Sequence, residues 1–340
     1  MSLISTIKRK NNKQLFTTPS HAGKICLFHK FYQWYKSDIS ETDAYNPVEA
    51  LKKTEKNAAD IYEVKYTKFL TNGSTSGIIT AILACGCKNI LIWNKAHPCH
   101  KNGAELAGCN IIEYSIPKDE ELGVYKAITV DIAEKLISHA KNNTALLITS
   151  PTYEGFAADI KKISMLCHEN NVKLIVDEAH GALYPFSDNL PESAVKYADY
   201  TVQSLHKTAG GINPTALLHS NDNNPSEALY KINTTSPSYP MLATIETNIN
   251  FLNSARGKKA IDKLLYGIKA LNLPVYNDDI TKIILKHPKY SGYELSEILY
   301  TRYNIEDERT NEKTTMLLCG IGTNEKKLAR LKKCLNNLGF

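Results

Sequence analysis

The sequence predicts an α/β protein whose mostly parallel sheet lies between helices, followed by a small C-terminal α+β unit. Between residues 71 and 220, short apolar runs alternate with segments in which apolar residues have helical spacing. Several runs are almost continuously apolar, which is typical of strands buried on both faces of a parallel sheet. Beyond residue 270 strands and helices still alternate, but in a different pattern that suggests a small α+β domain. A chain of 340 residues is long enough for one large core and a smaller one.

The strands and helices of the large sheet are predicted in chain order. Strands are predicted at residues 89–93, 110–114, 145–149, 173–177 and 200–204. Helices are predicted at residues 127–140 and 159–170, and Asp159 is a good N-cap for the second of them.

The C-terminal third has a different pattern. A long helical segment is predicted at residues 240–271, with a break near Gly257. The unit after it is predicted to have strands at residues 280–285 and 315–319 and helices at residues 291–303 and 324–338.

These elements divide the chain into three predicted parts. Residues 1–45 have weak periodicity and an aromatic cluster, which favours an arm that lies across a core or a partner. Residues 46–250 are predicted to form the large domain, and residues 251–340 the small one.

The composition excludes several classes of protein. With 43% hydrophobic and 22% charged residues the chain resembles an average globular protein. The 41 Lys and Arg outnumber the 35 Asp and Glu, but the lysines are scattered among acids, so no nucleic-acid-binding stripe is predicted. The eight cysteines lack zinc-site spacing, and the longest apolar run, residues 78–85, is too short to span a membrane. We therefore expect reduced thiols, no metal site, no membrane contact and a cytoplasmic location.

Polar residues that follow predicted strands are the candidates for a site, because ligands of open α/β sheets collect where strands end. Residues 72–77 read Asn-Gly-Ser-Thr-Ser-Gly and run into the apolar helical segment 78–85. The hydroxyls of Ser74, Thr75 and Ser76 and the free N–H groups of the helix start would form a phosphate cradle. Taken alone, the motif is equally well interpreted as an ordinary helix cap. It is neither a Walker loop nor a dinucleotide-binding fingerprint.

Two further motifs carry a histidine and a carboxylate. Residues 97–101 read His-Pro-Cys-His-Lys, and His97 could stack on an aromatic ligand, bind a metal or, as is commonest, hydrogen-bond a loop carbonyl. Residues 177–181 read Asp-Glu-Ala-His-Gly after an apolar strand. Asp177 could pair with a cationic ring nitrogen or a metal, and the small Ala179 would let a flat ligand lie close. The alternative is a solvated acidic loop.

The fourth motif carries a lysine. Residues 204–207 read Ser-Leu-His-Lys, and Lys207 would be a good Schiff-base nucleophile if desolvated, although most lysines are solvated surface residues. Together the motifs supply a phosphate cradle, a ring-stacking imidazole, a carboxylate for a pyridinium nitrogen and a lysine for an aldehyde. These are the requirements of pyridoxal 5'-phosphate (PLP).

At this point the pattern resembles a known family. Asp-x-Ala-His shortly before Ser-x-His-Lys, with Asn-Gly-Ser-Thr-Ser-Gly far upstream, is similar to the ornithine/lysine/arginine decarboxylase family of fold-type I PLP-dependent enzymes. Residues 18–23, 150–155 and 234–239 also resemble motifs of that family, and the chain looks like a short form of it. The resemblance implies the PLP-dependent transferase fold of the aspartate aminotransferase superfamily. It also implies a homodimer with shared active sites.

The resemblance further implies a role for each matching residue. Lys207 would form the Schiff base with PLP, Asp177 would keep the pyridine nitrogen protonated, and Ala179 and His97 would enclose the ring. His97 is preferred to His100 because its spacing to later glycines matches the family's histidine. The other predicted cofactor contacts are Ser74, Thr75, Ser76, His180, Ser204 and His206, together with Thr234 and Thr235, which would reach the neighbouring subunit's PLP.

The implied activity is decarboxylation of lysine, ornithine or arginine to an amine and CO2 through an external aldimine and a quinonoid, as in polyamine biosynthesis. Lys207 or His206 would return the proton to Cα. Transamination is disfavoured because only Arg256, Arg302 and Arg309 lie where an arginine fork is expected. A non-catalytic PLP-binding regulatory paralogue is the third alternative.

The sequence leaves the choice among basic substrates open. A basic side chain needs an anionic partner, and Glu154 is the preferred candidate because it lies in a matching motif. Asp38, Glu41 and Asp43 are the other candidates, and each of the four also suits a solvated surface.

Overall fold

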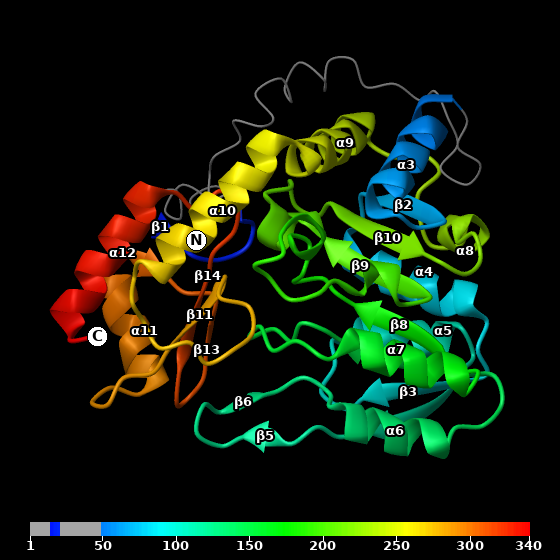
Figure 1. Ribbon diagram of the computed structural model, residues 1–340, viewed down its shortest axis with the longest axis horizontal. Coiled ribbons are helices and arrows are strands. Elements are labelled where there is room, and N and C mark those ends of the chain that lie inside the picture. The colour runs from blue at the N-terminus through cyan, green and yellow to red at the C-terminus, as the bar shows by residue number, and fades with distance from the viewer. Residues whose placement is uncertain (1–13, 21–48) are drawn as a thin grey trace, which may run out of the picture.

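The computed structural model describes residues 14–20 and 49–340, which form the two units seen in Figure 1. The larger unit has a central sheet with helices on both faces, and the smaller unit lies beside it and contains the C-terminus. The predicted α/β class is confirmed. The proposed division at residues 45 and 250 remains a prediction.

The central sheet has seven strands in the order β2-β10-β9-β8-β7-β3-β4. The strands β9, β8, β7, β3 and β4 are parallel to one another, whereas β10 is antiparallel to both of its neighbours, β9 and β2. The strands span Tyr66–Leu70 (β2), Asn89–Trp93 (β3), Asn110–Tyr114 (β4), Thr144–Thr149 (β7), Lys173–Asp177 (β8), Tyr200–Ser204 (β9) and Ala216–Ser220 (β10). All five predicted strands are present, and β2 and β10 are the two that the sequence pattern missed.

The parallel pairing brings the carboxyl ends of the central strands to one edge of the sheet. Asp177, the last residue of β8, pairs with Thr149 of β7 and with Val202 of β9. The polar motifs that follow these strands therefore start from neighbouring positions.

Helices cover both faces of the sheet because its strands are apolar on both sides. One face packs against α4 (Gly73–Cys85), α5 (Cys99–Leu106) and α8 (Ser226–Tyr230). The other packs against α6 (Val130–Ser138) and α7 (Ile160–Glu169) and, toward β2, against α3 (Glu49–Tyr62) and α9 (Tyr239–Asn253). The predicted N-cap of α7 is confirmed, since the Asp159 side chain accepts a hydrogen bond from the Lys162 N–H at 3.2 Å.

Helix α4 lies close to the sheet because of a glycine. A Cβ atom at Gly77 would be 2.7 Å from a methyl group of Leu70 and 2.8 Å from one of Val202. Real Cβ atoms essentially never come this close, so a larger residue at this position would force the side chains of Leu70 and Val202 to move. The helix start, which carries the predicted phosphate cradle, is thereby held against the strands.

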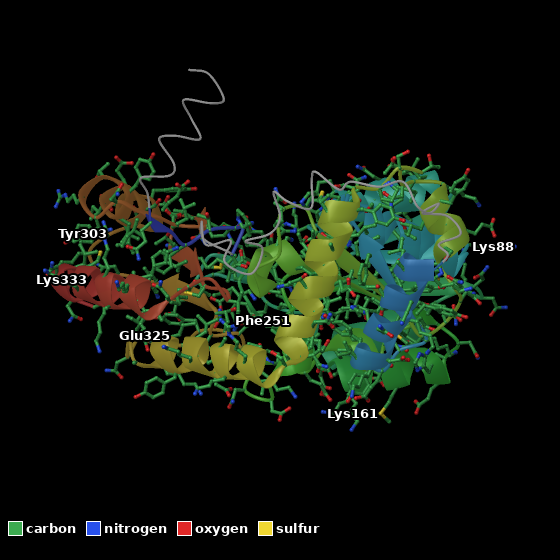
Figure 2. All side chains as sticks on the ribbon, turned by 90° about the horizontal axis from the view of Figure 1, so that it is seen from above. Lys88, Lys161, Phe251, Tyr303, Glu325 and Lys333 are labelled. Carbon is green, nitrogen blue, oxygen red and sulfur yellow. The ribbon has the colours of Figure 1, made fainter. Side chains whose placement is uncertain are left out.

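The two units are joined by α9 and α10 (Ala255–Lys269). The break between them falls at Ser254, three residues before the predicted position, because Ser254 is in extended conformation and caps α10. Its hydroxyl accepts a hydrogen bond from the Gly257 N–H and donates one to the Phe251 carbonyl. Figure 2 shows Phe251 where the two helices meet.

The small unit is an antiparallel sheet in the order β11-β14-β13, covered by helices. Its elements are β11 (Lys282–Leu285), α11 (Gly292–Arg302), β12 (Ile305–Glu306), β13 (Arg309–Thr310), β14 (Thr315–Leu318) and α12 (Glu325–Leu338). A short hairpin of the large unit, β5 (Lys118–Asp119) and β6 (Val124–Tyr125), extends toward it (Figure 1). In the described part of the chain, no helix combines the length and apolarity needed to cross a membrane.

A segment from the start of the chain completes the small unit. Strand β1 (Gln14–Leu15) pairs in parallel with β12. The Gln14 side chain donates to the carbonyl of Lys327 in α12, and the Lys327 ammonium donates to the Leu15 carbonyl. Most of the predicted arm, including Asp38, Glu41 and Asp43, lies outside the described residues.

Candidate active site

A cavity of about 660 Å³ opens where β3, β7 and β8 end and where β9 runs into the next turn. Nine of the residues predicted for the site line it: Ser74, Thr75, His97, Glu154, Asp177, Ala179, His180, His206 and Lys207. Ser76 and Ser204 are buried beside it, and Thr234 and Thr235 are exposed outside it. The structure thus brings four separate sequence motifs to one place.

Lys207 lies on a π-helical turn, Leu205–Ala209, that directly follows β9. Its Nζ atom is 3.1 Å from Nε2 of His180. Burial lowers the pKa of Lys207, while the charges of Asp177 and Glu308 act in the opposite direction and only partly offset it. An amine with a lowered pKa is more often neutral, and only the neutral amine is a nucleophile.

Asp177 faces the same cavity with a carboxylate that is held on both oxygens. Oδ2 is 2.9 Å from Nε2 of His100, and Oδ1 accepts a hydrogen bond from the Ala179 N–H at 3.1 Å. Burial alone would raise the pKa of Asp177, but the hydrogen bond and charge of His100 and the charge of Lys207 outweigh it and lower the pKa. A buried, ionised carboxylate is therefore available to a cationic group in the cavity.

The two histidines of the motif 97–101 have different surroundings. His97 is exposed on the cavity wall, and its Nδ1 atom accepts a hydrogen bond from the Cys99 N–H. His100 is fully buried behind Asp177, and its Nδ1 atom has no partner among the residues that the structure describes. Only His97 can therefore lie against a ligand in the cavity.

The start of α4 provides a place for an anion. Asn72 makes no side-chain cap, so the first N–H groups of the helix are not closed off by that residue, and Gly73 has a positive φ of 77°. Ser74 and Thr75 from this turn line the cavity, whereas the Ser76 hydroxyl donates to the Gly73 carbonyl. An uncapped helix start next to hydroxyl groups suits a phosphate.

Two buried hydroxyls point to the same conclusion. Oγ1 of Thr149, which lines the cavity, and Oγ of Ser204, which ends β9 three residues before Lys207, are buried with no hydrogen-bond partner among residues 14–20 and 49–340. Buried hydroxyls are rarely left unpaired, so such atoms next to a cavity indicate groups that a ligand satisfies. With the ionised Asp177 and the Lys207 amine, this donor set fits PLP.

The opposite wall carries charged groups that the sequence did not single out as a set. The Tyr153 ring packs on His180 with ring centres 4.6 Å apart, and the Arg309 guanidinium lies 4.8 Å above the Tyr153 ring. Nη1 of Arg309 is 3.4 Å from Oε1 of Glu154. Burial raises the pKa of Glu154, and the charge of Arg309 opposes this effect. This wall combines one anion and one cation.

Several site residues were missed by sequence reasoning. From the sequence, His100 is only an alternative to His97, and Arg309 is only one of three arginines that could form a fork. Tyr153 lies in the matching motif 150–155 but has no role predicted from it, and Glu308 has no sequence signal. The structure shows the Tyr153 hydroxyl donating to Glu308 at 2.5 Å. Glu308 belongs to the small unit, so only the packing of the two units reveals it.

The fold and the site together define a class. A sheet with a single antiparallel strand next to one edge, a carboxylate at the end of β8 and a lysine just after β9 are the arrangement of fold-type I PLP-dependent enzymes. A family model described as "Orn/Lys/Arg decarboxylase, major domain" matches residues 4–284. The chain belongs to this family, as its motifs suggested.

Curated relatives agree with this assignment. An arginine decarboxylase from Halalkalibacterium halodurans is 28% identical over 87% of this chain and 66% of its own length. An arginine decarboxylase from Bacillus subtilis is 27% identical over 99% of this chain and 76% of its own length. The chain therefore spans about two thirds to three quarters of these relatives.

Solved structures share the fold. A Francisella novicida lysine decarboxylase superposes with a TM-score of 0.75 at 17% identity, over 92% of this chain and 55% of that one. Serine palmitoyltransferase from S. paucimobilis superposes with a TM-score of 0.72 at 13% identity, over 96% and 87% of the two chains. The second protein is described with a PLP–myriocin aldimine bound.

Proposed function

We propose that this protein decarboxylates a basic amino acid, either lysine, ornithine or arginine, with PLP bound through Lys207. The observation that carries the proposal is that the Lys207 amine and the ionised Asp177 carboxylate face one cavity in a chain of the decarboxylase family. Relatives named arginine decarboxylase support the substrate class.

The residues present would hold the cofactor at four points. Lys207 would bind its aldehyde, Asp177 its pyridine nitrogen, and His97 and Ala179 the two faces of its ring. The phosphate would lie at the start of α4, with Ser74, Thr75, Ser204 and His206. When bound, PLP supplies an aldehyde that condenses with amines and a ring that takes up the electrons of the broken bond.

The protein's own contribution is orientation and proton transfer. Decarboxylation requires the bond to the carboxylate to stand perpendicular to the cofactor ring, so the site must fix the substrate's rotation. Of the two candidates for returning a proton to Cα, Lys207 is the better supported. Its amine would already lie at the cofactor's aldehyde. In His206, burial lowers the pKa, and Nδ1 is engaged with the Thr215 carbonyl, which leaves Nε2 without a proton to give.

Glu154 is the proposed partner of the substrate's distal cation. Its side chain is only 12% exposed and contacts Arg309, whose own side chain is 56% exposed and lines the same cavity. Glu154→Gln should raise KM for the preferred diamino acid about tenfold and leave PLP affinity unchanged. Glu121→Gln, which removes a surface partner of Lys286, is the matched control and should not change KM. An unchanged KM in Glu154→Gln would remove this role.

The activity is tested by offering lysine, ornithine and arginine separately to the purified, PLP-loaded protein and measuring amine and CO2. Product from one of them, absent in Lys207→Ala, supports the proposal. A keto acid without CO2 would instead indicate transamination, for which the presence of Arg309 in the cavity is the supporting observation. A yellow protein that releases neither would indicate a regulatory PLP-binding paralogue.

We also propose a cytoplasmic homodimer, with the amine product serving polyamine biosynthesis. Thr234 and Thr235 are exposed outside the cavity, as residues that reach a neighbouring subunit would be. Light scattering of the purified protein measures the subunit number.

A further inference from the structure

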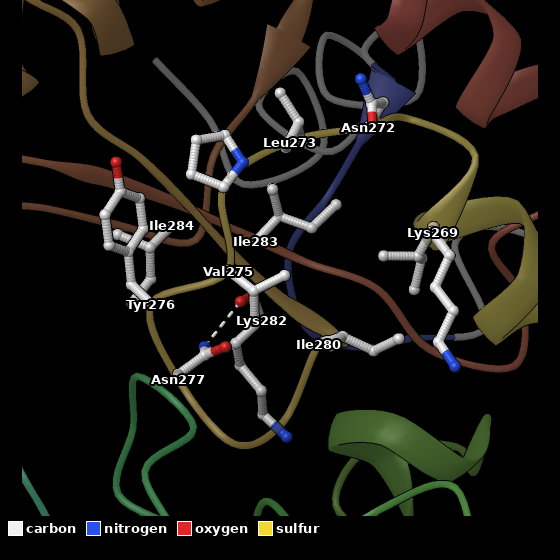
Figure 3. Close-up of a pocket in the computed structure, with 12 residues that line it drawn as sticks. Lys269, Asn272, Leu273, Val275, Tyr276, Asn277, Ile280, Lys282, Ile283 and Ile284 are labelled. Carbon is white, nitrogen blue, oxygen red and sulfur yellow. Dashed lines mark hydrogen bonds between the residues drawn. The ribbon is translucent and has the colours of Figure 1, made fainter.

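A buried lysine of the small unit reaches the wall of the active-site cavity. Lys282 is the first residue of β11, and its side chain is 0% exposed. Its Nζ atom donates to the carbonyl oxygen of His180 at 2.7 Å and pairs with the carboxylate of Asp279. Figure 3 shows Lys282 beside a neighbouring pocket, with its side chain extending away from that pocket toward the green segments of the large unit.

Both oxygens of the Asp279 carboxylate accept hydrogen bonds from neighbouring groups. Its Oδ1 atom accepts hydrogen bonds from the N–H and the hydroxyl of Thr281, at 2.9 and 2.6 Å. Its Oδ2 atom accepts the Tyr184 hydroxyl at 2.7 Å as well as Lys282. Burying two charges costs several kcal/mol, and apolar replacements are often as stable, so a buried pair is poorly explained by stability alone.

His180 connects this pair to Lys207. Its carbonyl oxygen is held by Lys282, and its Nε2 atom is 3.1 Å from Nζ of Lys207. Its ring is packed on Tyr153. Fixing the main chain of His180 therefore fixes the ring nitrogen that contacts the reactive amine.

We propose that Lys282 and Asp279 are positioning residues, which hold His180 against Lys207 and place a balanced pair of charges beside the reactive amine. The inference rests on the role proposed for Lys207. Neither Lys282 nor Asp279 lines the cavity in which the substrate would bind. Both would act on Lys207 through His180 and through their charges. The titratable groups that face Lys207 are Asp177 at the end of β8, His97 before α5, Cys99 of α5, His180, the adjacent His206, Glu308 between β12 and β13, and Lys282 itself.

The two members of the pair should have opposite effects. The charge of Lys282 lowers the pKa of Lys207, in addition to the larger effect of burial. Lys282→Met removes a cation and should raise that pKa, whereas Asp279→Asn leaves the cation unbalanced and should lower it further. A general loosening of the fold would not shift the two variants in opposite directions.

The chain offers a matched control whose residues do not line the cavity. Lys68 of β2 and Glu55 of α3 form another buried ion pair, with Nζ 2.7 Å from Oε2 and side chains 10% and 8% exposed. Lys68→Met therefore breaks a comparable pair without touching the lining of the cavity. It reports what the loss of a buried pair does to stability alone.

The experiment measures how fast acetic anhydride labels Lys207 in the PLP-free protein as a function of pH, with mass spectrometry to identify the lysine. Relative to the wild-type protein, we expect the midpoint to rise by about half a pH unit or more in Lys282→Met and to fall by a similar amount in Asp279→Asn. In Lys68→Met the midpoint should stay unchanged although Tm falls.

Two results would overturn the proposal: unchanged midpoints in both variants of the pair, or shifts in the same direction. If Lys282→Met does not fold, the midpoint of Asp279→Asn decides alone. Labelling needs no cofactor, so it is independent of the proposed function. Wild-type protein that is labelled at Lys207 but never turns yellow with PLP would refute the function and leave this inference standing.

Discussion

Two carboxylates that are adjacent in the chain, Asp177 and Glu178, face opposite sides of the central sheet at the end of β8. Asp177 contacts His100 of α5 and lines the cavity. Glu178 contacts the segment 193–194 on the other face, where it accepts hydrogen bonds from the Ser193 hydroxyl and the Ala194 N–H, both at 2.7 Å. Both are buried, so the comparison isolates the effect of their partners.

Glu178 has more hydrogen bonds but the higher proton affinity. A third donor, the Gln203 amide at 2.6 Å, links it to His219 and from there to Thr67. Burial nevertheless raises the pKa of Glu178 to about 7. The pKa of Asp177 is lowered although it has fewer donors.

The difference teaches that the kind of partner, and not the number of hydrogen bonds, decides which carboxylate stays ionised. Asp177 faces the charge of Lys207 and the imidazole of His100. The hydrogen-bond donors to Glu178 are neutral, and the charge of Lys282, which is paired with Asp279, lowers the pKa of Glu178 less than they do. Neutral donors do not compensate for the water that a buried carboxylate loses.

The largest expected effect tests whether the two faces have different functions. Asp177→Asn keeps the size of the side chain but removes its charge, so kcat should fall by about 10²–10⁴-fold. Glu178→Gln should keep kcat within about threefold, because Glu178 does not line the cavity. Steady-state kinetics of both variants with the same substrate measures this; equal losses would contradict the comparison.

A smaller effect is expected from His100, whose ring contacts the Asp177 carboxylate. His100→Phe removes a hydrogen bond that lowers the pKa of Asp177, so that pKa should rise. Because the carboxylate is needed in its ionised form, the acidic limb of the kcat/KM profile should move to higher pH, with roughly a tenfold loss at the acidic end. His100→Gln retains a donor for Asp177 and should restore most of the profile. A profile that does not move in His100→Phe would show that His100 only fills space.

The smallest effect concerns stability on the Glu178 face. A folded-state pKa of about 7, above the ordinary value of 4.5, means that the folded protein binds a proton that the unfolded chain releases. The resulting stabilisation is complete below pH 4.5 and is lost as the pH rises through 7, by about 3 kcal/mol in total.

Glu178→Gln mimics the protonated form and should flatten this dependence. Urea unfolding of the wild-type protein and the variant at several pH values between 5 and 8 gives the difference directly. Parallel curves would mean that Glu178 does not titrate in this range.

The sequence predicted the parallel core well because its strands carry local signals. Four of the five predicted strands have the predicted bounds, and the fifth begins one residue earlier, at Thr144. Strand β2 was missed since it carries Lys68, which reads as a surface residue. Lys68 is buried because Glu55 neutralises it, and no local pattern reports that ion pair.

Prediction of the site has the same limit, because only signals that are local in the sequence can be recognised. Asp177, Lys207, His97 and the start of α4 could be predicted, because each follows a strand or opens a helix that the sequence reveals. The contacts of His100 with Asp177 and of Lys282 with His180 depend on how helices and units pack. Such pairings between distant positions cannot be derived from one sequence.

The pairing of β1 with β12 has a consequence for the order in which the chain can fold during synthesis. All seven strands of the central sheet lie between residues 66 and 220, so the sheet can close while the rest is still being translated. The first strand must wait for β12 and for α12, which holds it through Lys327. The small unit, which supplies Arg309 to the cavity wall, is therefore completed only after α12 has been synthesised.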